Sequence, residues 1–587
     1  MRTTERRGAP ARLLASLLSL LPSRADLAAM GRTPGRDLVA GFTVAIVALP
    51  LALGFGISSG LGAQAGLATA VVAGALAAVF GGSRLQVTGP TGAMTVVLVP
   101  IAHAHGAPGV LTVGLLAGIA LVVLAVVRAG RWMVYVPAPV VEGFTIGIAC
   151  VIALQQVPSA LGVPTPEGDR VTLVAAQAVA DFLRSPDWPA VTVAVAVAAA
   201  MLLGARWRPS VPFSLLAVAA ATVLAEAVSL DVARIGELPA GLPLPSLGFL
   251  DPAAVPSLLG PALAVAALAA LESLLSAAVA DGMSVDSRHD PDKELFGQGV
   301  ANLAAPLFGG VPATGAIART AVNVRAGASS RLAALVHAAV LAAVVLAAAP
   351  LVARIPLAAL AGVLLATAVR MVEVGSVRAM VRSTRADGFV LVLTAVATLA
   401  LDLVQAVVIG MVVAGALALR AVARDAGLAR VPLHADTSGD HDEEERALLA
   451  EHIVAYRIDG PLFFAAAHRF LLELSEVADV SVVILRMSRV TTIDASGALV
   501  LKDAIERLEH RGITVLVSGI RDGHDRPLDA LGVIDRLRAD GRVFDTTPEA
   551  VRAARALLVR PSGPDRPVPP ARTGGADSPA AADSPAA

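Results

Sequence analysis

Long apolar segments alternate with short polar breaks over the first 423 residues of the chain. A helix needs roughly 20 residues to cross a hydrocarbon core about 30 Å thick, and most of these segments approach that length. The pattern therefore predicts an α-helical polytopic membrane domain over residues 39–423. We expect about fourteen spans, at residues 39–58, 64–80, 90–105, 110–128, 136–157, 189–205, 211–229, 258–280, 294–308, 314–325, 332–349, 356–372, 388–401 and 403–422.

The basic residues between the spans predict their orientation, because cytoplasmic loops collect Lys and Arg. If the N-terminus is cytoplasmic, every loop after an even-numbered span is also inside, and each of these loops is basic. An even number of spans places both termini in the cytoplasm. The basic residues are Arg84; Arg128 and Arg131; Arg206 and Arg208; Arg288 and Lys293; Arg325 and Arg331; and Arg378, Arg382 and Arg385.

Two short motifs occupy the third span of each half of the membrane domain. Thr91-Gly92-Ala93 follows Pro90, and Thr314-Gly315-Ala316 follows Pro312 at a short distance. Three matching residues in an Ala-rich chain can arise by coincidence, so their corresponding positions carry the argument. Interrupted helices at equivalent places in two halves are typical of inverted-repeat transporters, so we expect two inverted repeats of seven spans.

A helix that begins inside the membrane directs unpaired N–H groups and a partial positive charge into the space before it. Two such starts that face each other would bind an anion. The predicted donors are the N–H groups around Gly92, Ala93, Gly315 and Ala316, with the hydroxyl of Thr91 in addition.

Ionisable residues are rare inside the spans, where each costs roughly 2.5–3.5 kcal/mol on insertion scales. Glu272 and Arg319 are the notable cases, and we expect them to form an ion pair. The pair would either tie two helices together or act as a protonatable coupling element beside the anion. Ser276, one helical turn after Glu272, would share that site.

The region after Arg424 has the composition of a soluble protein. An acidic linker at 424–447 leads to strands at 453–458, 480–486 and 513–518 and to helices at 465–477 and 496–510. This alternation predicts a small α/β domain at 448–560, with Ser496 exposed at a helix start, where a capping role would suffice. Residues 1–38 form a cytoplasmic tail, although their basic start also resembles a secretory signal, and the Pro- and Ala-rich residues 561–587 form a disordered tail.

Composition excludes several classes of function. Hydrophobic residues make up 56% of the chain and charged residues 16%, as expected for a protein in a lipid bilayer. A net charge of −1 argues against a nucleic-acid partner, and the single Cys150 excludes an internal disulfide. His103 and His105 lack a third ligand, so we expect no metal and no cofactor.

Four motifs of the chain occur together in one known family of membrane proteins. They are Ala48-Leu49-Pro50-Leu51, Val87-Thr88-Gly89-Pro90-Thr91, Glu272-Ser273-Leu274-Leu275-Ser276 and Gly297-Gln298-Gly299-Val300-Ala301-Asn302. With these motifs the chain resembles the sulfate permease (SulP) anion transporters over nearly its whole length. The resemblance implies a transporter rather than an enzyme, with gate and core domains, a homodimer and a C-terminal STAS domain. It matches Phe55 to a cavity-lining aromatic residue and Ser496 to a phosphorylatable serine, which implies a cytoplasmic regulator.

Differences within the family bear on substrate and coupling. Sodium-coupled bicarbonate carriers have Asp at the position of Glu272 and a small residue at that of Arg319, whose fixed charge disfavours a cation site. Residues 316–328 and 460–467 are more similar to a bacterial branch known for C4-dicarboxylate uptake. We therefore expect secondary active transport of sulfate, bicarbonate or a C4-dicarboxylate across the plasma membrane, by elevator-like alternating access coupled to protons or to exchange. The alternatives are an anion channel and a sensory membrane protein whose output is the STAS domain.

Overall fold

The computed structural model describes residues 20–22, 28–168, 170–207, 211–239, 241–284, 288–401, 403–425, 427–431, 452–463, 480–521 and 523–559. The chain divides into two compact units, Met1–Gly415 and Ala416–Ala587.

The helices of the first unit follow the same order twice. Each of the fourteen predicted apolar segments contains helix, and two inverted repeats of seven segments account for the order. The first repeat consists of α3 (Pro34–Ser58), α4 (Ala63–Phe80), the two halves of α5 (Gly92–Val126), α6 (Ala138–Gln155), α9 (Trp188–Trp207) and α10 (Phe213–Ala227). The second consists of α11 (Val255–Met283), α12 (Pro291–Ala304), α13 (Ile317–Arg325), α14 (Leu332–Ala347), α16 (Leu357–Met371), α18 (Arg385–Ala400) and α19 (Leu403–Asp425).

A two-residue strand precedes the broken helix of each repeat. Strand β1 (Thr88–Gly89) leads to α5 and strand β2 (Thr314–Gly315) leads to α13. The two strands pair antiparallel, as inversion of the repeats requires. This pairing brings the starts of α5 and α13 together although more than 200 residues separate them in the sequence.

Residues 92–126 form two helices that meet at a break at Gly106, whose φ of +64° favours glycine, and the two spans predicted there are confirmed. The helices differ from the predicted spans in two ways. Helices α8 (Val171–Arg184) and α17 (Val374–Ser383) are additional, because amphipathic helices lack the long apolar run on which the prediction depended. Among the described helices, eight are long and apolar enough to cross a membrane, so several predicted spans are short helices.

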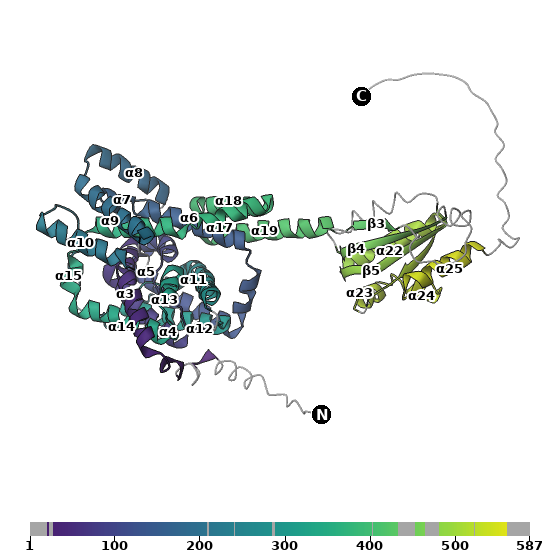
Figure 1. The fold of residues 1–587 in the computed structure, drawn as a ribbon, viewed down its shortest axis with the longest axis horizontal. Helices are drawn as coiled ribbons and strands as arrows, with labels where there is room; N and C mark the ends of the chain where they lie inside the picture. The colour runs from purple at the N-terminus through teal and green to yellow at the C-terminus, as the bar shows by residue number, and fades with distance from the viewer. Residues whose placement is uncertain are drawn as a thin grey trace, which may run out of the picture. The chain divides into compact units, whose positions relative to one another are not determined.

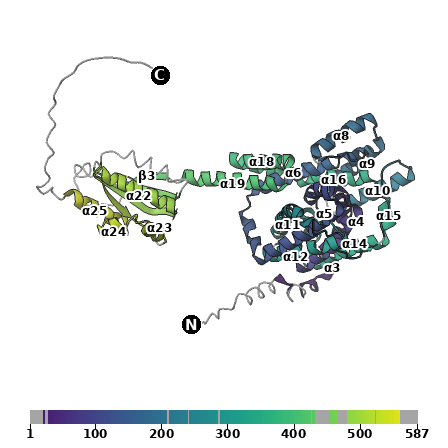
Figure 2. The same cartoon turned by 180° about the vertical axis from the view of Figure 1, so that it is seen from behind.

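The membrane helices form two bundles. Helices α3, α4, α5, α11, α12, α13 and α14 pack against one another, whereas α6, α9, α10, α16 and α18 form a second group (Figures 1 and 2). Small residues permit the close packing of the first bundle. A Cβ atom on Gly66 of α4 would lie 2.0 Å from the carbonyl oxygen of Ala52 on α3.

The second unit contains a five-stranded sheet in the order β3-β4-β5-β6-β7. Strands β4 (Ile453–Leu462), β5 (Val482–Ile493), β6 (Thr514–Ser518) and β7 (Val543–Phe544) are parallel, and β3 (Gly427–Val431) pairs antiparallel with β4. Residues 427–431 therefore belong to the sheet and not to the linker to which we assigned them. The predicted helix at 465–477, the rest of the linker and the tail at 561–587 lie outside the described residues.

Alternate side chains of β5 pack on opposite faces of this sheet, as strand geometry dictates. Val483 and Leu485 pack in the cluster that contains Leu501 of α22 (Ala495–His510). Val482 and Ile484 pack in the cluster that contains Ala550 of α25 (Thr547–Val559). The unit is thus a helix–sheet–helix α/β domain.

Candidate anion-binding site

The start of α5 is a buried, capped helix terminus. Thr91 is the N-cap residue, and its Oγ1 accepts a hydrogen bond from the backbone N–H of Met94 at 3.4 Å. Gly92 and Ala93 are the first two helical residues, so their N–H groups have no acceptor within the helix. Pro90, just before the cap, has no N–H of its own. Buried N–H groups therefore converge at Gly92 and Ala93, where we predicted donors.

The start of α13 lies further along the chain than we predicted. Ala316 is the residue before the helix, and its N–H donates to the carbonyl oxygen of Val87 at 2.9 Å. Gly315 belongs to β2, and Ile317 and Ala318 are the first helical residues, whose N–H groups have no acceptor within the helix. The N–H of Ala316 is already bonded, so the prediction that it is an anion donor is wrong. The donor role of Gly315 stays a prediction.

The register of the internal repeat explains this displacement. Thr88 pairs with Gly315, and Gly89 pairs with Thr314. Thr314-Gly315 forms strand β2 as Thr88-Gly89 forms strand β1, so it occupies the place of Thr88-Gly89 and not that of Thr91-Gly92 at the start of α5. Thr-Gly occurs twice within five residues of the first half, and sequence matching alone selected the wrong copy.

Arg319 lies in the first turn of α13 with a side chain that is almost fully buried. Its Nη2 donates to the carbonyl oxygen of Pro90, and its Nη1 has no partner among the described residues. The guanidinium lies against Gly89, where a Cβ atom would come within 2.5 Å of Nη1. An unpartnered N–H group of a buried arginine beside two helix starts is suited to an anion.

Glu272 approaches the same turn from α11. Its Oε2 accepts a hydrogen bond from Thr91 Oγ1 at 2.8 Å. Glu272 and Arg319 therefore bind the neighbouring residues Thr91 and Pro90 rather than each other, and the expected direct ion pair is wrong. Their opposite charges still attract each other across the turn.

Ser276 is fully buried, and its hydroxyl group is hydrogen-bonded to another hydroxyl group. Its Oγ lies 3.0 Å from Oγ1 of Thr320, which accepts the N–H of Val87 at 3.0 Å. This chain of bonds ties α11 to α13 and to the residue before β1. Ser276 thus holds the framework of the site, and its hydroxyl is not turned toward the unpaired N–H groups at Gly92.

Two apolar side chains cover the start of α5. A Cβ atom on Gly92 would lie 2.1 Å from Cδ1 of Ile152 and 3.1 Å from Cε1 of Phe55. Phe55, which we predicted to line the site, is on α3, whereas Ile152 belongs to α6 of the second bundle. Sequence reasoning missed Ile152, because nothing marks one isoleucine in an apolar helix as special.

Polar side chains of α12 hold both strands in place. Gln298 Nε2 donates to Thr88 Oγ1 at 2.7 Å. Asn302 donates to the carbonyl oxygen of Ala313 and accepts the N–H of the same residue, each at 2.8 Å. The polar part of the motif at 297–302 thus orients the approach to both helix starts.

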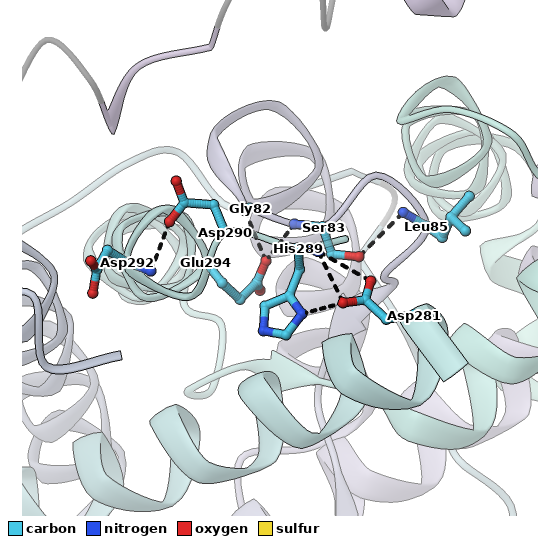
Figure 3. A network of polar contacts seen from close by, with 8 residues as sticks. All are labelled: Gly82, Ser83, Leu85, Asp281, His289, Asp290, Asp292 and Glu294. Carbon is cyan, nitrogen blue, oxygen red and sulfur yellow. Dashed lines mark hydrogen bonds and ion pairs between the residues drawn. The ribbon is translucent and has the colours of Figure 1, made fainter. Parts of the chain in front are cut away.

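A further polar network supports this arrangement at the start of α12 (Figure 3). The buried carboxylate of Glu294 accepts the N–H groups of Gly82 and Ser83 at 2.9 and 3.0 Å. Asp281 at the end of α11 accepts the backbone N–H of His289, and its Oδ2 lies 2.7 Å from His289 Nδ1. These contacts join the end of α4 and the end of α11 to α12.

A cavity of about 260 Å³ lies between the two bundles. It is lined by Gly54 of α3, Val99 of α5 and Gln155 at the end of α6, together with hydroxyl groups such as that of Ser58.

Inverted repeats whose broken helices meet in the middle of a helical bundle define a membrane transport protein. The particular family follows from sequence comparison. The Sulfate permease family matches residues 35–394 and the STAS domain matches residues 447–550, so the chain belongs to the sulfate permease family.

Relatives and solved structures agree with this assignment. The chain is 35% identical to a putative sulfate transporter, YvdB, of Bacillus subtilis, over 86% of this chain and 94% of the relative. It is 30% identical to the bicarbonate transporter BicA of Synechocystis, over 89% and 94%. The transmembrane domain of a cyanobacterial BicA aligns with a TM-score of 0.59 at 31% identity, over 65% of this chain and 98% of that structure. The structure of SLC26A9 shares the fold, with a TM-score of 0.78 at 17% identity, over 95% and 98%.

Proposed function

We propose that this protein is a secondary active transporter of small oxyanions across the plasma membrane, with both termini in the cytoplasm. The observation that carries the proposal is the meeting of the α5 and α13 starts beside the unpartnered Nη1 of buried Arg319. The substrate class comprises sulfate, bicarbonate and C4-dicarboxylates. The names of the relatives, which include sulfate and bicarbonate transporters, support the first two.

The site recognises negative charge and offers few contacts that distinguish one oxyanion from another. Unpaired N–H groups at Gly92 and Ala93, the positive ends of two helices and one guanidinium all stabilise an anion. In surroundings that exclude water, each contributes more than it would in solution.

Glu272 supplies a physical basis for proton coupling. Its carboxylate is bonded to Thr91, the cap of the helix that binds the anion, so its negative charge opposes anion binding. Two unit charges about 6 Å apart repel by about 3 kcal/mol at an effective dielectric constant of about 20. Protonation of Glu272 removes this repulsion, so a proton and an anion bind together. Arg319 beside the same turn disfavours a sodium ion.

The two bundles suit elevator-like alternating access. The anion site belongs to the bundle of α3, α5, α11 and α13, whereas Ile152, which covers it, belongs to the other bundle. Movement of the first bundle past α6 would release this cover and open the site. We further propose a homodimer and a cytoplasmic regulator of the STAS domain at Ser496.

Uptake into proteoliposomes tests the proposal. Radiolabelled sulfate, bicarbonate and succinate are offered separately, with and without sodium and with and without an inward proton gradient. We expect one of these anions to accumulate above electrochemical equilibrium when the proton gradient is present, independently of sodium. Flux that reaches only equilibrium would indicate a channel, and accumulation that needs sodium would make sodium, rather than the proton, the coupling ion.

A further inference from the structure

Helix α17 has an amphipathic surface that no described part of the first unit covers. None of its ten residues is buried. The apolar side chains of Val374 and Val381 are 71% and 50% exposed. Arg378 and Arg382, one helical turn apart, lie beside this apolar stripe, since positions 374, 378, 381 and 382 fall within one side of a helix.

The helix is attached to the second bundle at one end of the membrane domain. Ser376 lies near Glu142 in the first turns of α6, and α17 packs against α18. The segment that leads into α6 carries Arg128 and Arg131. The positive-inside rule therefore places the start of α6 at the cytoplasmic surface. Helix α17 lies beside this start, so it is at the same surface, and the argument does not depend on the arginines of α17 itself.

The charge of this surface is predominantly positive. Residues 370–387 contain four arginines and two acidic residues, Glu373 and Asp387. Arg378 and Arg382 are exposed, and neither has a hydrogen-bond or ion-pair partner among the described residues. A short helix with exposed valines beside free arginines matches the boundary between acyl chains and phosphate groups.

We propose that α17 lies in the headgroup layer of the cytoplasmic leaflet and binds anionic phospholipids through Arg378 and Arg382. The valines enter the acyl region, and the guanidinium groups bind lipid phosphates. Bound lipid would anchor the bundle of α6, α16 and α18 to the membrane while the other bundle moves. This binding goes beyond the proposed transport function, because it does not depend on which anion is carried or on its coupling.

Thermal unfolding of the purified full chain in a neutral detergent tests the proposal. Short-chain phosphatidylglycerol is titrated against short-chain phosphatidylcholine, and glycerol 3-phosphate tests whether a soluble phosphate suffices. We expect phosphatidylglycerol alone to raise Tm, because a ligand that binds the folded state stabilises it. In Arg378→Gln/Arg382→Gln, binding should weaken about 25-fold, since each basic residue at an anionic surface contributes roughly fivefold in affinity.

Arg184→Gln is the matched control. Arg184 belongs to amphipathic α8, but it already forms an ion pair with Asp181 at 2.9 Å. This variant should respond to phosphatidylglycerol like the wild type, and so should Arg378→Lys/Arg382→Lys, which keeps the charge and guards against a loss of folding. Equal responses to both lipids, or an undiminished response of the glutamine variant, would overturn the proposal. The proposal would also be overturned if the glutamine variant changed from dimer to monomer while its response to phosphatidylglycerol stayed the same. The exposed face of α17 would then contact a second copy of the chain.

Discussion

The hydroxyl group of Thr91 donates a hydrogen bond to Glu272 at 2.8 Å while it caps the helix that begins at Gly92. One oxygen atom therefore connects a titratable carboxylate on α11 with the predicted anion donors on α5.

Replacement of Thr91 by Val should uncouple the carboxylate of Glu272 from the predicted anion donors on α5. Loss of an N-cap oxygen costs about 1 kcal/mol of helix stability, and the carboxylate loses its hydrogen-bond donor. We expect weaker anion binding, measured by isothermal titration calorimetry, and a smaller effect of pH on it. Thr91→Ser keeps the oxygen and should retain both properties, so an equal defect in this variant would contradict the role of the hydroxyl.

Replacement of Glu272 by Gln should remove the pH dependence of uptake. The amide cannot ionise, so the site behaves at every pH as if it were protonated. At alkaline pH, where the wild-type carboxylate repels the anion, affinity should rise by on the order of 100-fold. Anion dissociation constants measured over a range of pH give the answer, and a retained pH dependence would place the proton elsewhere.

Replacement of Arg319 by Ala should weaken anion binding by on the order of 100-fold, because a buried positive charge near the ligand is lost. Gly89→Ala should act in the same direction, since its Cβ atom would displace the guanidinium. Circular dichroism verifies that both variants are folded. Unchanged affinity of a folded Arg319→Ala protein would make this arginine a purely structural residue.

Replacement of Gly92 by Ala should arrest transport through a clash with Ile152. The added methyl group would come within 2.1 Å of Cδ1 of that side chain. Adding Ile152→Ala to the Gly92→Ala protein removes the clashing side chain and should restore uptake. If the double variant instead showed the sum of the two single defects, the clash would not be the cause of the arrest. Uptake rates of the wild type, both single variants and the double variant complete this cycle.

The STAS domain permits a test that separates a cap from a modification site. Asp494 caps α22 by accepting the N–H of Gly497 at 2.7 Å, so Ser496 is an exposed first-turn residue and not the cap we expected. Asp494→Ala should increase hydrogen exchange in the first turn of α22, by an amount that corresponds to about 1 kcal/mol. Ser496→Ala should leave exchange unchanged and abolish any phosphorylation by cell extract. Increased exchange in Ser496→Ala would restore the capping role.

Much of the membrane fold could be predicted because lipid imposes long apolar runs, and basic loops orient them. Glu272 and Arg319 could be singled out for a related reason, since charge inside a span is costly. Their contacts could not be predicted. Whether Arg319 binds Glu272 or the carbonyl of Pro90 depends on distances of a few ångströms between helices that are far apart in the sequence.

The features that were missed share a physical cause. The register of β1 and β2 depends on which of two Thr-Gly pairs faces Thr314, and both satisfy the local pattern. Helix α17 is too short and too polar to stand out as a span, and Ile152 is one apolar residue among many. Tertiary packing, rather than local preference, gives each of them its role.

The hydrogen-bonded pairing of β1 with β2 also bears on the energetics of the transport cycle. In the proposed alternating access, two helix starts that are bonded to each other would keep their separation and orientation whichever compartment they face. An anion would then meet the same dissociation constant on the cytoplasmic and the external side. A carrier of this kind is reversible, and the direction of net flux follows from the gradients of its ions alone.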